Sequence, residues 1–530
     1  MPPIAKTQNL PSRRSAAVAG SGILLSRLAG LVRERVFAYY FGNSAAADAF
    51  KAAFRIPNLL QNLFGEGVLS ASFIPVYVGL RTHGQDEEAK RLAGAVFALL
   101  ALAAAVLVVV GVAAAPWLID VIAAGFKGST RVLTIHLVRI FFPGAGLLVL
   151  SAWCLSVLNS HRHFFLSYAA PVIWNGAIIA ALVIFGGRWG RFDLAEWVAL
   201  GAVVGAALQV AIQWPTVRRI LGPLRLSLNH RLPHVREVIR NSTPAFASRG
   251  VIQISSYVDA FLASYLPTGA MAALAYATTL YLLPISLFSM SVSAVELPAM
   301  SGALGGVATA DAHAVLRQRL GAGLRQITFF VLPSALAFLL LGDVIVAAIY
   351  RTGAFNGADV YYVWGTLAGA TVGLLASALG RLYSSTYFAL RDTLRPLHCA
   401  MVRVGLTTVL GIIGAFWLPG WLGISARWGV AGLTLAAGIA AWVEMTLLRR
   451  GLRHRLQAAR LSRLYLTKIA AAAALAAVLA RALFNHLPPR WGTWSTAIVV
   501  LGVYGLIYLG AAWLMRVPEV GALRRLARRG

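Results

Sequence analysis

LAGAVFALLALAAAVLVVVGVAAA, residues 92–115, is a stretch of 24 residues that contains no charged or strongly polar side chain. A helix that crosses the hydrocarbon core of a bilayer needs about 20 such residues. Similar stretches recur along the 530-residue chain, which is 59% hydrophobic and 12% charged. A soluble domain carries about a quarter charged residues. The composition therefore predicts an all-α polytopic membrane protein without a large soluble domain.

The apolar stretches predict about fourteen transmembrane helices by this length criterion. Their expected bounds are 18–40, 47–80, 92–115, 132–158, 164–185, 197–216, 238–265, 270–297, 320–341, 361–388, 397–418, 430–448, 465–483 and 494–515. The longest basic link, residues 218–240, separates two groups of six, an arrangement common in transporters. We expect an N-lobe over residues 1–222, a C-lobe over residues 223–450, and a basic link with two further helices over residues 451–530.

The net charge of +29 is concentrated in alternate links and in both tails. The positive-inside rule then predicts that both termini are cytoplasmic. This distribution, with attraction to anionic lipid headgroups, explains the charge without a nucleic-acid partner. The sequence contains no phosphate-binding loop, no HExxH motif and no GxSxG motif. Its two cysteines, Cys154 and Cys399, lie in apolar segments, where they are expected to pack as small hydrophobic residues. The sequence thus predicts a protein that is not an enzyme and has no cofactor or metal.

The first two predicted spans are unusually polar. A central Arg or Lys costs at least about 2.5–3.5 kcal/mol in a bilayer, so such side chains face protein or water. In the second span, polar residues recur every three or four positions, which places them on one helix face. The residues concerned in the two spans are Ser26, Arg27, Arg33, Glu34, Asp48, Lys51, Arg55, Asn58, Gln61, Asn62 and Glu66. Because Arg binds phosphate oxygens in pairs, we expect a hydrated cationic groove for a diphosphate.

A purely structural role is the alternative for some of these charges. Arg35 and Lys51 lie near the predicted turn at residues 42–46, where they could snorkel to the interface or form internal ion pairs. Glu34 and Glu66 could be pairing partners, proton carriers or both. Asp259 and Arg403, in the seventh and eleventh predicted spans, could form a structural salt bridge.

Four motifs stand out in the first two predicted spans. They are SRLAGLVRE at residues 26–34, ADAF at 47–50, FRIPNLL at 54–60, and FGEG at 64–67 followed by SASFIP at 70–75. The first is similar to the SRxxGxxR(D/E) pattern of the MurJ/MviN family of lipid II flippases, and the other three resemble the next motifs of that family.

The resemblance implies the MOP exporter fold, with two lobes around a central cavity, in the bacterial inner membrane. It also implies that lipid II, the undecaprenyl-diphosphate-linked muropeptide, is moved outward by alternating access, with membrane lipids and cell-wall synthesis proteins as further partners. The cavity arginines of the family fall on Arg27 and Arg33, and its acid in the first outward turn falls on Asp48.

Two positions depart from the family pattern. Gln61 and Thr279 stand where the family has arginines, and Arg249 or Arg55 could compensate. Asp259 matches an acid of the sodium site seen in some members, whereas Arg403 stands where polar ligands are expected. We expect substrate binding by Arg27, Arg33, Arg55, Asn58, Gln61, Asn62 and Arg249, and gating or ion pairing by Ser26, Glu34, Asp48, Glu66, Asp259 and Arg403.

Two other functions remain open at this level. One is export of another lipid-linked oligosaccharide or an anionic small molecule, which the missing cations at Gln61 and Thr279 favour. The other is a membrane scaffold that recruits cell-wall enzymes without transport, in which case Arg27 and Arg33 would be dispensable.

Overall fold

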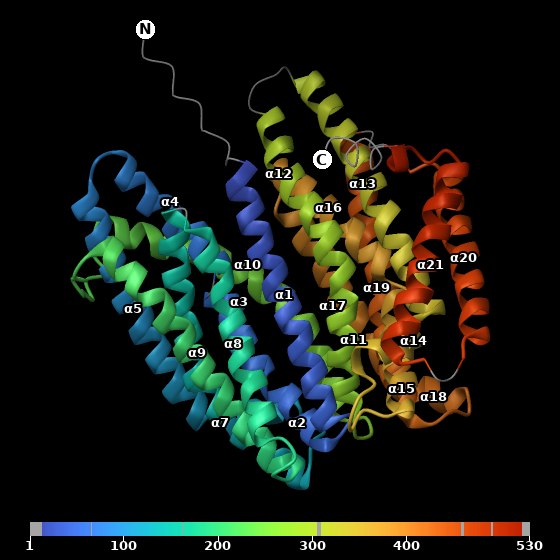
Figure 1. Ribbon diagram of the computed structural model, residues 1–530. Helices are drawn as coiled ribbons and strands as arrows, with labels where there is room; N and C mark the ends of the chain where they lie inside the picture. Colours follow the sequence, from blue (N-terminus) through green and yellow to red (C-terminus); the bar gives the residue numbers. More distant parts are fainter. Residues whose placement is uncertain are drawn as a thin grey trace. The chain divides into compact units, whose positions relative to one another are not determined.

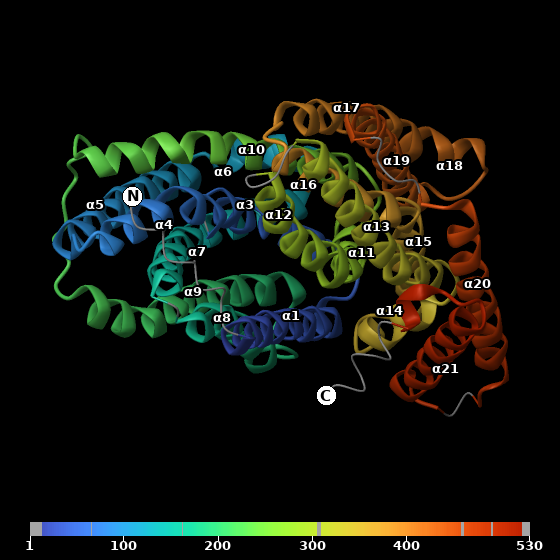
Figure 2. The same cartoon turned by 90° about the horizontal axis from the view of Figure 1, so that it is seen from above.

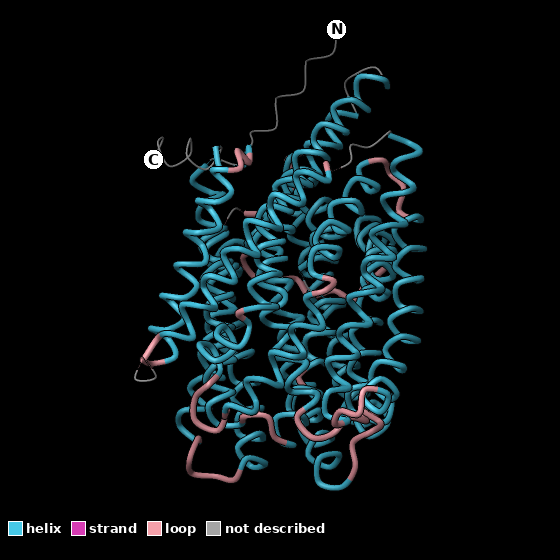
Figure 3. The backbone as a smooth tube through the Cα atoms, turned by 90° about the vertical axis from the view of Figure 1, so that its right-hand side faces the viewer, coloured by secondary structure: helices cyan, strands magenta, loops and turns pink. Residues whose placement is uncertain are grey.

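A computed structural model describes the backbone of residues 13–64, 66–161, 163–304, 309–456, 461–488 and 491–521. Within these ranges every regular element is a helix, which confirms the predicted all-α class (Figure 1). Short loops join most of the described helices (Figure 3).

The chain divides into two compact units. Unit 1 comprises Met1–Phe41 and Ala45–Gln253, and unit 2 comprises Gly42–Ser44 and Ile254–Gly530. The division falls inside a long helix, Pro233–Ser264, whereas the sequence predicted a boundary at residues 222/223. Residues 451–530, predicted as a third segment, group with unit 2.

The helices of unit 1 follow one another as α1 Arg13–Phe41, α2 Ala45–Ala53, α3 Arg55–Phe64, α4 Glu66–Thr82, α5 Asp86–Ala113, α6 Ala115–Ile122, α7 Gly128–Ser160, α8 Phe164–Phe185, α9 Arg191–Leu221 and α10 Pro233–Ser264, the last of which continues into unit 2. Those of unit 2 are α11 Ala270–Pro284, η1 Ile285–Met290, α12 Ser291–Leu304, α13 Thr309–Leu340, α14 Gly342–Tyr350, α15 Gly357–Thr371, α16 Leu374–Ala389, α17 Leu394–Ile412, η2 Ile413–Trp417, α18 Leu418–Trp421, η3 Ala426–Trp428, α19 Gly429–Leu456, α20 Arg463–His486 and α21 Thr493–Leu514.

The predicted count of fourteen spans is not confirmed. In the described part of the chain, nine helices are long and apolar enough to cross a membrane, and α15 with α16, bent by 42°, would make a tenth. The second predicted span, residues 47–80, is three shorter helices, α2, α3 and α4. Pro57 lies in the first turn of α3, where a backbone N–H has no helical acceptor, so proline favours a new helix start there.

Helix α7 is central to unit 1. It packs against α2, α3, α4, α5 and α9. Figure 2 shows it beside α9. Trp153 of α7 is fully buried in an apolar cluster with Phe73 and Tyr77 of α4. The 33 residues of α7 give a length of about 50 Å, well above the roughly 30 Å of a hydrocarbon core.

Unit 2 is built around α19, which packs against α15, α16 and α17, while α20 and α21 pair with each other and with α13 and α14. Alanines of α20 form much of the interface with α13 and α21. Small side chains let helices approach closely where no water is present to drive association. The Tyr504 and Tyr508 hydroxyls of α21 donate to the carbonyls of Pro333 and Phe329 at 2.7 and 2.6 Å.

Two glycines bring η2 and α19 into backbone contact. A Cβ added to Gly432 would lie 2.0 Å from the carbonyl oxygen of Gly414, and one added to Gly414 would lie 2.6 Å from that of Gly432. Because both obstacles are backbone atoms, neither could move aside as a side chain would.

We expect Gly432→Ala to lower the melting temperature of the purified protein, because η2 and α19 would have to separate. Overpacking of this kind costs about 1–3 kcal/mol. The matched control is Gly405→Ala on α17, where an added Cβ meets nothing within 4 Å. That change should be neutral or stabilising, because Ala favours a helix more than Gly does. Equal melting temperatures for Gly432→Ala and the parent would contradict the close approach.

Candidate functional site

Three charged side chains of α1 and α2 form one network in unit 1. Glu34 of α1 accepts from the guanidinium of Arg33 at 2.7 Å and, through its other carboxylate oxygen, from the ammonium of Lys51 of α2. Arg33 Nη1 also donates to Asn175 Oδ1 of α8 at 3.0 Å, and the Asn175 amide donates to the Pro171 carbonyl at 2.9 Å. Asn175 and Glu34 therefore hold the two terminal nitrogens of the guanidinium.

Aromatic rings lie close to both cations. The Arg33 guanidinium carbon lies 5.1 Å from the ring centroid of Phe54 and 5.7 Å from that of Trp174. These two rings stack on each other, with centroids 5.4 Å apart and an interplanar angle of 9°. Lys51 Nζ lies 4.1 Å from the centroid of Phe37. Cation–π attraction at such distances stabilises charges that have lost water.

Arg33 is the accessible member of the network. Its side chain is 16% exposed, against 8% for Glu34 and 7% for Lys51. Two cations and one anion leave the network with a formal charge of +1. Of the five N–H donors of a guanidinium, the described contacts of Arg33 use two. The remaining donors can bind an anion while Glu34 stays paired.

The other candidates on α1 to α3 lie in different environments. Arg27 is exposed, about 9 Å along α1 from Arg33, and it has no ion-pair partner among the described residues. Ser26 is partly exposed, and Asp48 is buried in α2. Arg55 is partly exposed at the start of α3, and Asn58 is exposed.

The predicted single polar face of the second span, from Lys51 to Ser70, is interrupted between Lys51 and Asn58. Lys51 lies on α2 and is buried, whereas Asn58 lies on α3 and is exposed. The helix is interrupted between Ala53 and Arg55, so a three-to-four-residue spacing no longer keeps these side chains in line. The backbones of Gln61, Asn62, Glu66 and Arg249 are helical, but their side chains lie outside the described residues.

A second polar cluster lies in unit 2. Arg403 of α17 donates to Glu444 of α19 at 3.0 Å, and Tyr281 of α11 donates to Ser377 of α16 at 2.9 Å. Asp259, predicted to pair with Arg403, is partly exposed on α10. Thr279 of α11 donates its hydroxyl to the carbonyl of Ala275 at 3.0 Å.

Asn175 and Glu444 are the partners that sequence reasoning missed. Each is a polar residue inside an otherwise apolar segment, a pattern that predicts a buried polar contact. The pattern could have identified both residues, although not the arginines that they contact.

Comparison with known proteins gives consistent results. The family described as "Lipid II flippase MurJ" matches residues 37–502. The Burkholderia cenocepacia protein named "Lipid II flippase MurJ" is 33% identical over 441 residues, which cover 82% of each chain. The Rhizobium tropici "Probable lipid II flippase MurJ" is 31% identical over 529 residues, covering 96% of this chain and 95% of the relative.

Solved structures resemble the fold. A structure described as "Lipid II flippase MurJ, inward closed conformation" superimposes with a TM-score of 0.76 and 24% identity, covering 94% of this chain and 98% of that one. An inward-facing multidrug resistance MATE transporter of the MOP superfamily gives a TM-score of 0.65 at 15% identity, with 83% and 99% covered. The expected MOP exporter-like fold is therefore confirmed.

Proposed function

Because the chain belongs to the family of the lipid II flippase MurJ, we propose that it carries the diphosphate–disaccharide head of lipid II from the cytoplasmic to the outer face of the bacterial inner membrane. It would do so by alternating access, with both termini in the cytoplasm. Its relatives are named as flippases, which are transporters, and we propose transport without catalysis for this chain too. Cell-wall synthesis proteins that make or use lipid II are the protein partners that we propose.

The network at Arg33 is the observation that best supports this function. Glu34 and Asn175 fix the guanidinium from two sides, so its free donors are oriented before a ligand arrives. A site held in its binding geometry loses less entropy when it binds. Surrounding rings reduce the water around Arg33, which strengthens its attraction for a phosphate oxygen. We assign the first diphosphate contact to Arg33.

The remaining candidates receive supporting roles. Arg27, about two turns away on the same helix, would bind the second phosphate or guide the head along α1. Arg55 and Asn58, with Gln61, Asn62 and Arg249, would line the path. Glu34, Asp48, Ser26 and Glu66 would pair with cations or control access. The Arg403–Glu444 contact supports a structural role for Arg403, and Asp259 is assigned to gating.

We expect Arg27→Ala to reduce the initial rate of lipid II flipping about tenfold, the effect of losing one charge-assisted contact. Proteoliposomes containing fluorescent lipid II measure this rate as the fraction of label that becomes accessible to an impermeant quencher. The melting temperature should stay unchanged, because Arg27 is exposed. Arg188→Ala, which removes an exposed charge beside α9, is the control. Flipping by Arg27→Ala at the parent rate would contradict the role of Arg27.

Export of a different lipid-linked anion is the second candidate. Thr279 stands where the resemblance implies an arginine, and its hydroxyl donates to the Ala275 carbonyl of its own helix. The substrate site would therefore have one cation fewer than the family pattern implies. Complementation of cells depleted of their own flippase separates the two candidates: rescue supports lipid II as the cargo, and failure by a well-expressed protein supports another substrate.

A further inference from the structure

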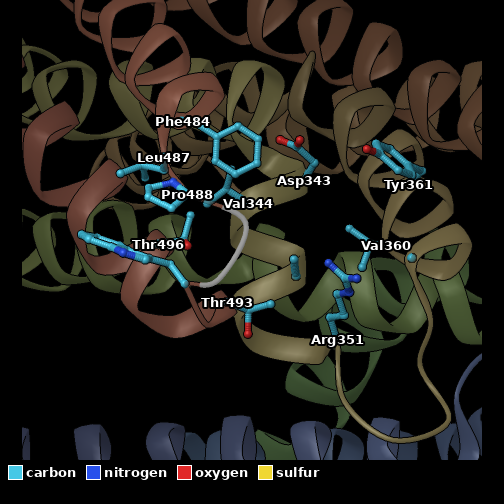
Figure 4. A pocket seen from close by; sticks show the side chains of 13 residues that line it. Asp343, Val344, Arg351, Val360, Tyr361, Phe484, Leu487, Pro488, Thr493 and Thr496 are labelled. Atoms are coloured by element: carbon cyan, nitrogen blue, oxygen red, sulfur yellow. The ribbon is translucent and has the colours of Figure 1, made fainter.

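A pocket of about 400 Å³ lies within unit 2, along the length of α14 and beside the start of α15, the end of α20 and the start of α21 (Figure 4). Its volume is within the 300–1,000 Å³ range of ligand-binding pockets. Each helix contributes residues one turn apart, or nearly so, which places them on a common face. The lining residues are Asp343, Val344, Ala347, Arg351, Gly357, Val360, Tyr361, Phe484, Leu487, Pro488, Trp491, Thr493 and Thr496.

The charge in this pocket is uneven. Asp343 accepts from Arg481 Nη1 with both carboxylate oxygens, at 2.7 and 2.8 Å, so its charge is neutralised. Arg351, just beyond the other end of α14, is exposed, and its side chain has no ion-pair partner among the described residues. In Figure 4, Arg351 and Thr493 lie toward one end of the pocket and Asp343 and Phe484 toward the other. The pocket therefore offers one uncompensated cation with hydroxyl groups beside it.

The rest of the lining is apolar or aromatic. Phe484, Leu487 and Val360 provide a surface for hydrocarbon, and Trp491 and Tyr361 are 44% and 56% exposed. Trp and Tyr are enriched at the level of lipid headgroups, where one end of the ring is apolar and the other meets water. A ligand that matches both the cation at Arg351 and the apolar wall has an anionic head and an apolar tail.

We propose that this pocket binds the headgroup of an anionic membrane phospholipid. Its phosphate would lie on Arg351, its glycerol hydroxyls near Thr493 and Thr496, and the beginning of an acyl chain against Phe484 and Leu487. A zwitterionic choline headgroup should bind less tightly, because its net charge is zero and Arg351 attracts a net anion more strongly. A free inorganic phosphate would leave the apolar wall unused.

Native mass spectrometry of the detergent-purified full chain, titrated with phosphatidylglycerol or phosphatidylcholine, tests this assignment. We expect one preferred phosphatidylglycerol per chain, and about tenfold weaker binding after Arg351→Gln, since a charge-assisted hydrogen bond is lost. Arg188→Gln, which removes an exposed charge of unit 1, should bind like the parent. Asp343→Asn should bind phosphatidylglycerol more tightly than the parent, because the lining would lose the negative charge of Asp343 and no longer offset the nearby cations.

Three results would overturn the assignment. One is parent-like affinity of Arg351→Gln for phosphatidylglycerol, and another is equal binding of the two phospholipids by the parent. The third is a competition result: equimolar undecaprenyl diphosphate displaces phosphatidylglycerol, and Arg351→Gln weakens the binding of both ligands equally. That result would assign the pocket to the transported lipid. Binding is measured without transport, so a failed flipping assay would not decide the outcome.

Discussion

Replacing Arg33 with glutamine should reduce lipid II flipping about a hundredfold. A guanidinium that makes two charge-assisted hydrogen bonds to a diphosphate contributes about 3 kcal/mol or more, and glutamine keeps neither the charge nor the forked geometry. The folded protein should persist, because Glu34 remains paired with Lys51. The initial flipping rate in proteoliposomes measures the loss, and the melting temperature shows whether the protein stays folded.

Arg33→Lys is the matched control for this prediction. It keeps the charge but presents a single ammonium, so it should recover part of the flipping rate. Asn175→Ala should reduce the rate less than Arg33→Gln, because it removes only the contact that orients the guanidinium. Parent-like flipping by Arg33→Gln would refute the diphosphate site. Rescue of depleted cells by a variant that no longer flips lipid II would support the scaffold alternative.

Glu34→Gln should destabilise the protein by about 3–5 kcal/mol, the range found when one partner of a buried ion pair is removed. Lys51 and Arg33 would be left without their anion, and Lys51 is only 7% exposed. Denaturant and thermal unfolding of the purified protein would measure the loss as lower midpoints. The control is Glu196→Gln, whose half-exposed carboxylate faces His136 at 3.9 Å and contributes little.

A second change isolates the role of Lys51. The double variant Glu34→Gln with Lys51→Met removes both the anion and the buried ammonium, so it should regain much of the lost stability. If the double variant is as unstable as Glu34→Gln alone, the cost does not come from burying the Lys51 ammonium without the Glu34 carboxylate. Methionine keeps the length and the apolar stem of the lysine side chain, so packing against Phe37 is largely preserved.

Composition and apolar length were enough to predict the membrane fold class, and four local motifs predicted the family. The polar character of α1 and α2 was also evident from sequence, because charges are rare in apolar segments. The prediction from periodicity was wrong between Lys51 and Asn58. Periodicity assumes an unbroken helix, but the chain is interrupted between α2 and α3, and Lys51 is buried whereas Asn58 is exposed.

The partners of Arg33 and Arg403 could not be predicted in the same way. Asn175 is 142 residues from Arg33, and Glu444 is 41 residues from Arg403. Such contacts depend on how α1 packs against α8 and α17 against α19. The sequence shows that these charges need partners, but only the packed helices show which residues provide them.

The ion pair between Glu34 and Lys51 has a consequence for how the nascent chain enters the membrane. The two residues are 17 positions apart, on helices joined by the turn at Gly42–Ser44. Either charge alone would resist leaving the translocon for lipid, whereas the paired charges cost less there, although Arg33 keeps the network at a net charge of +1. We therefore expect α1 and α2 to insert together, after ribosomal synthesis has passed Lys51.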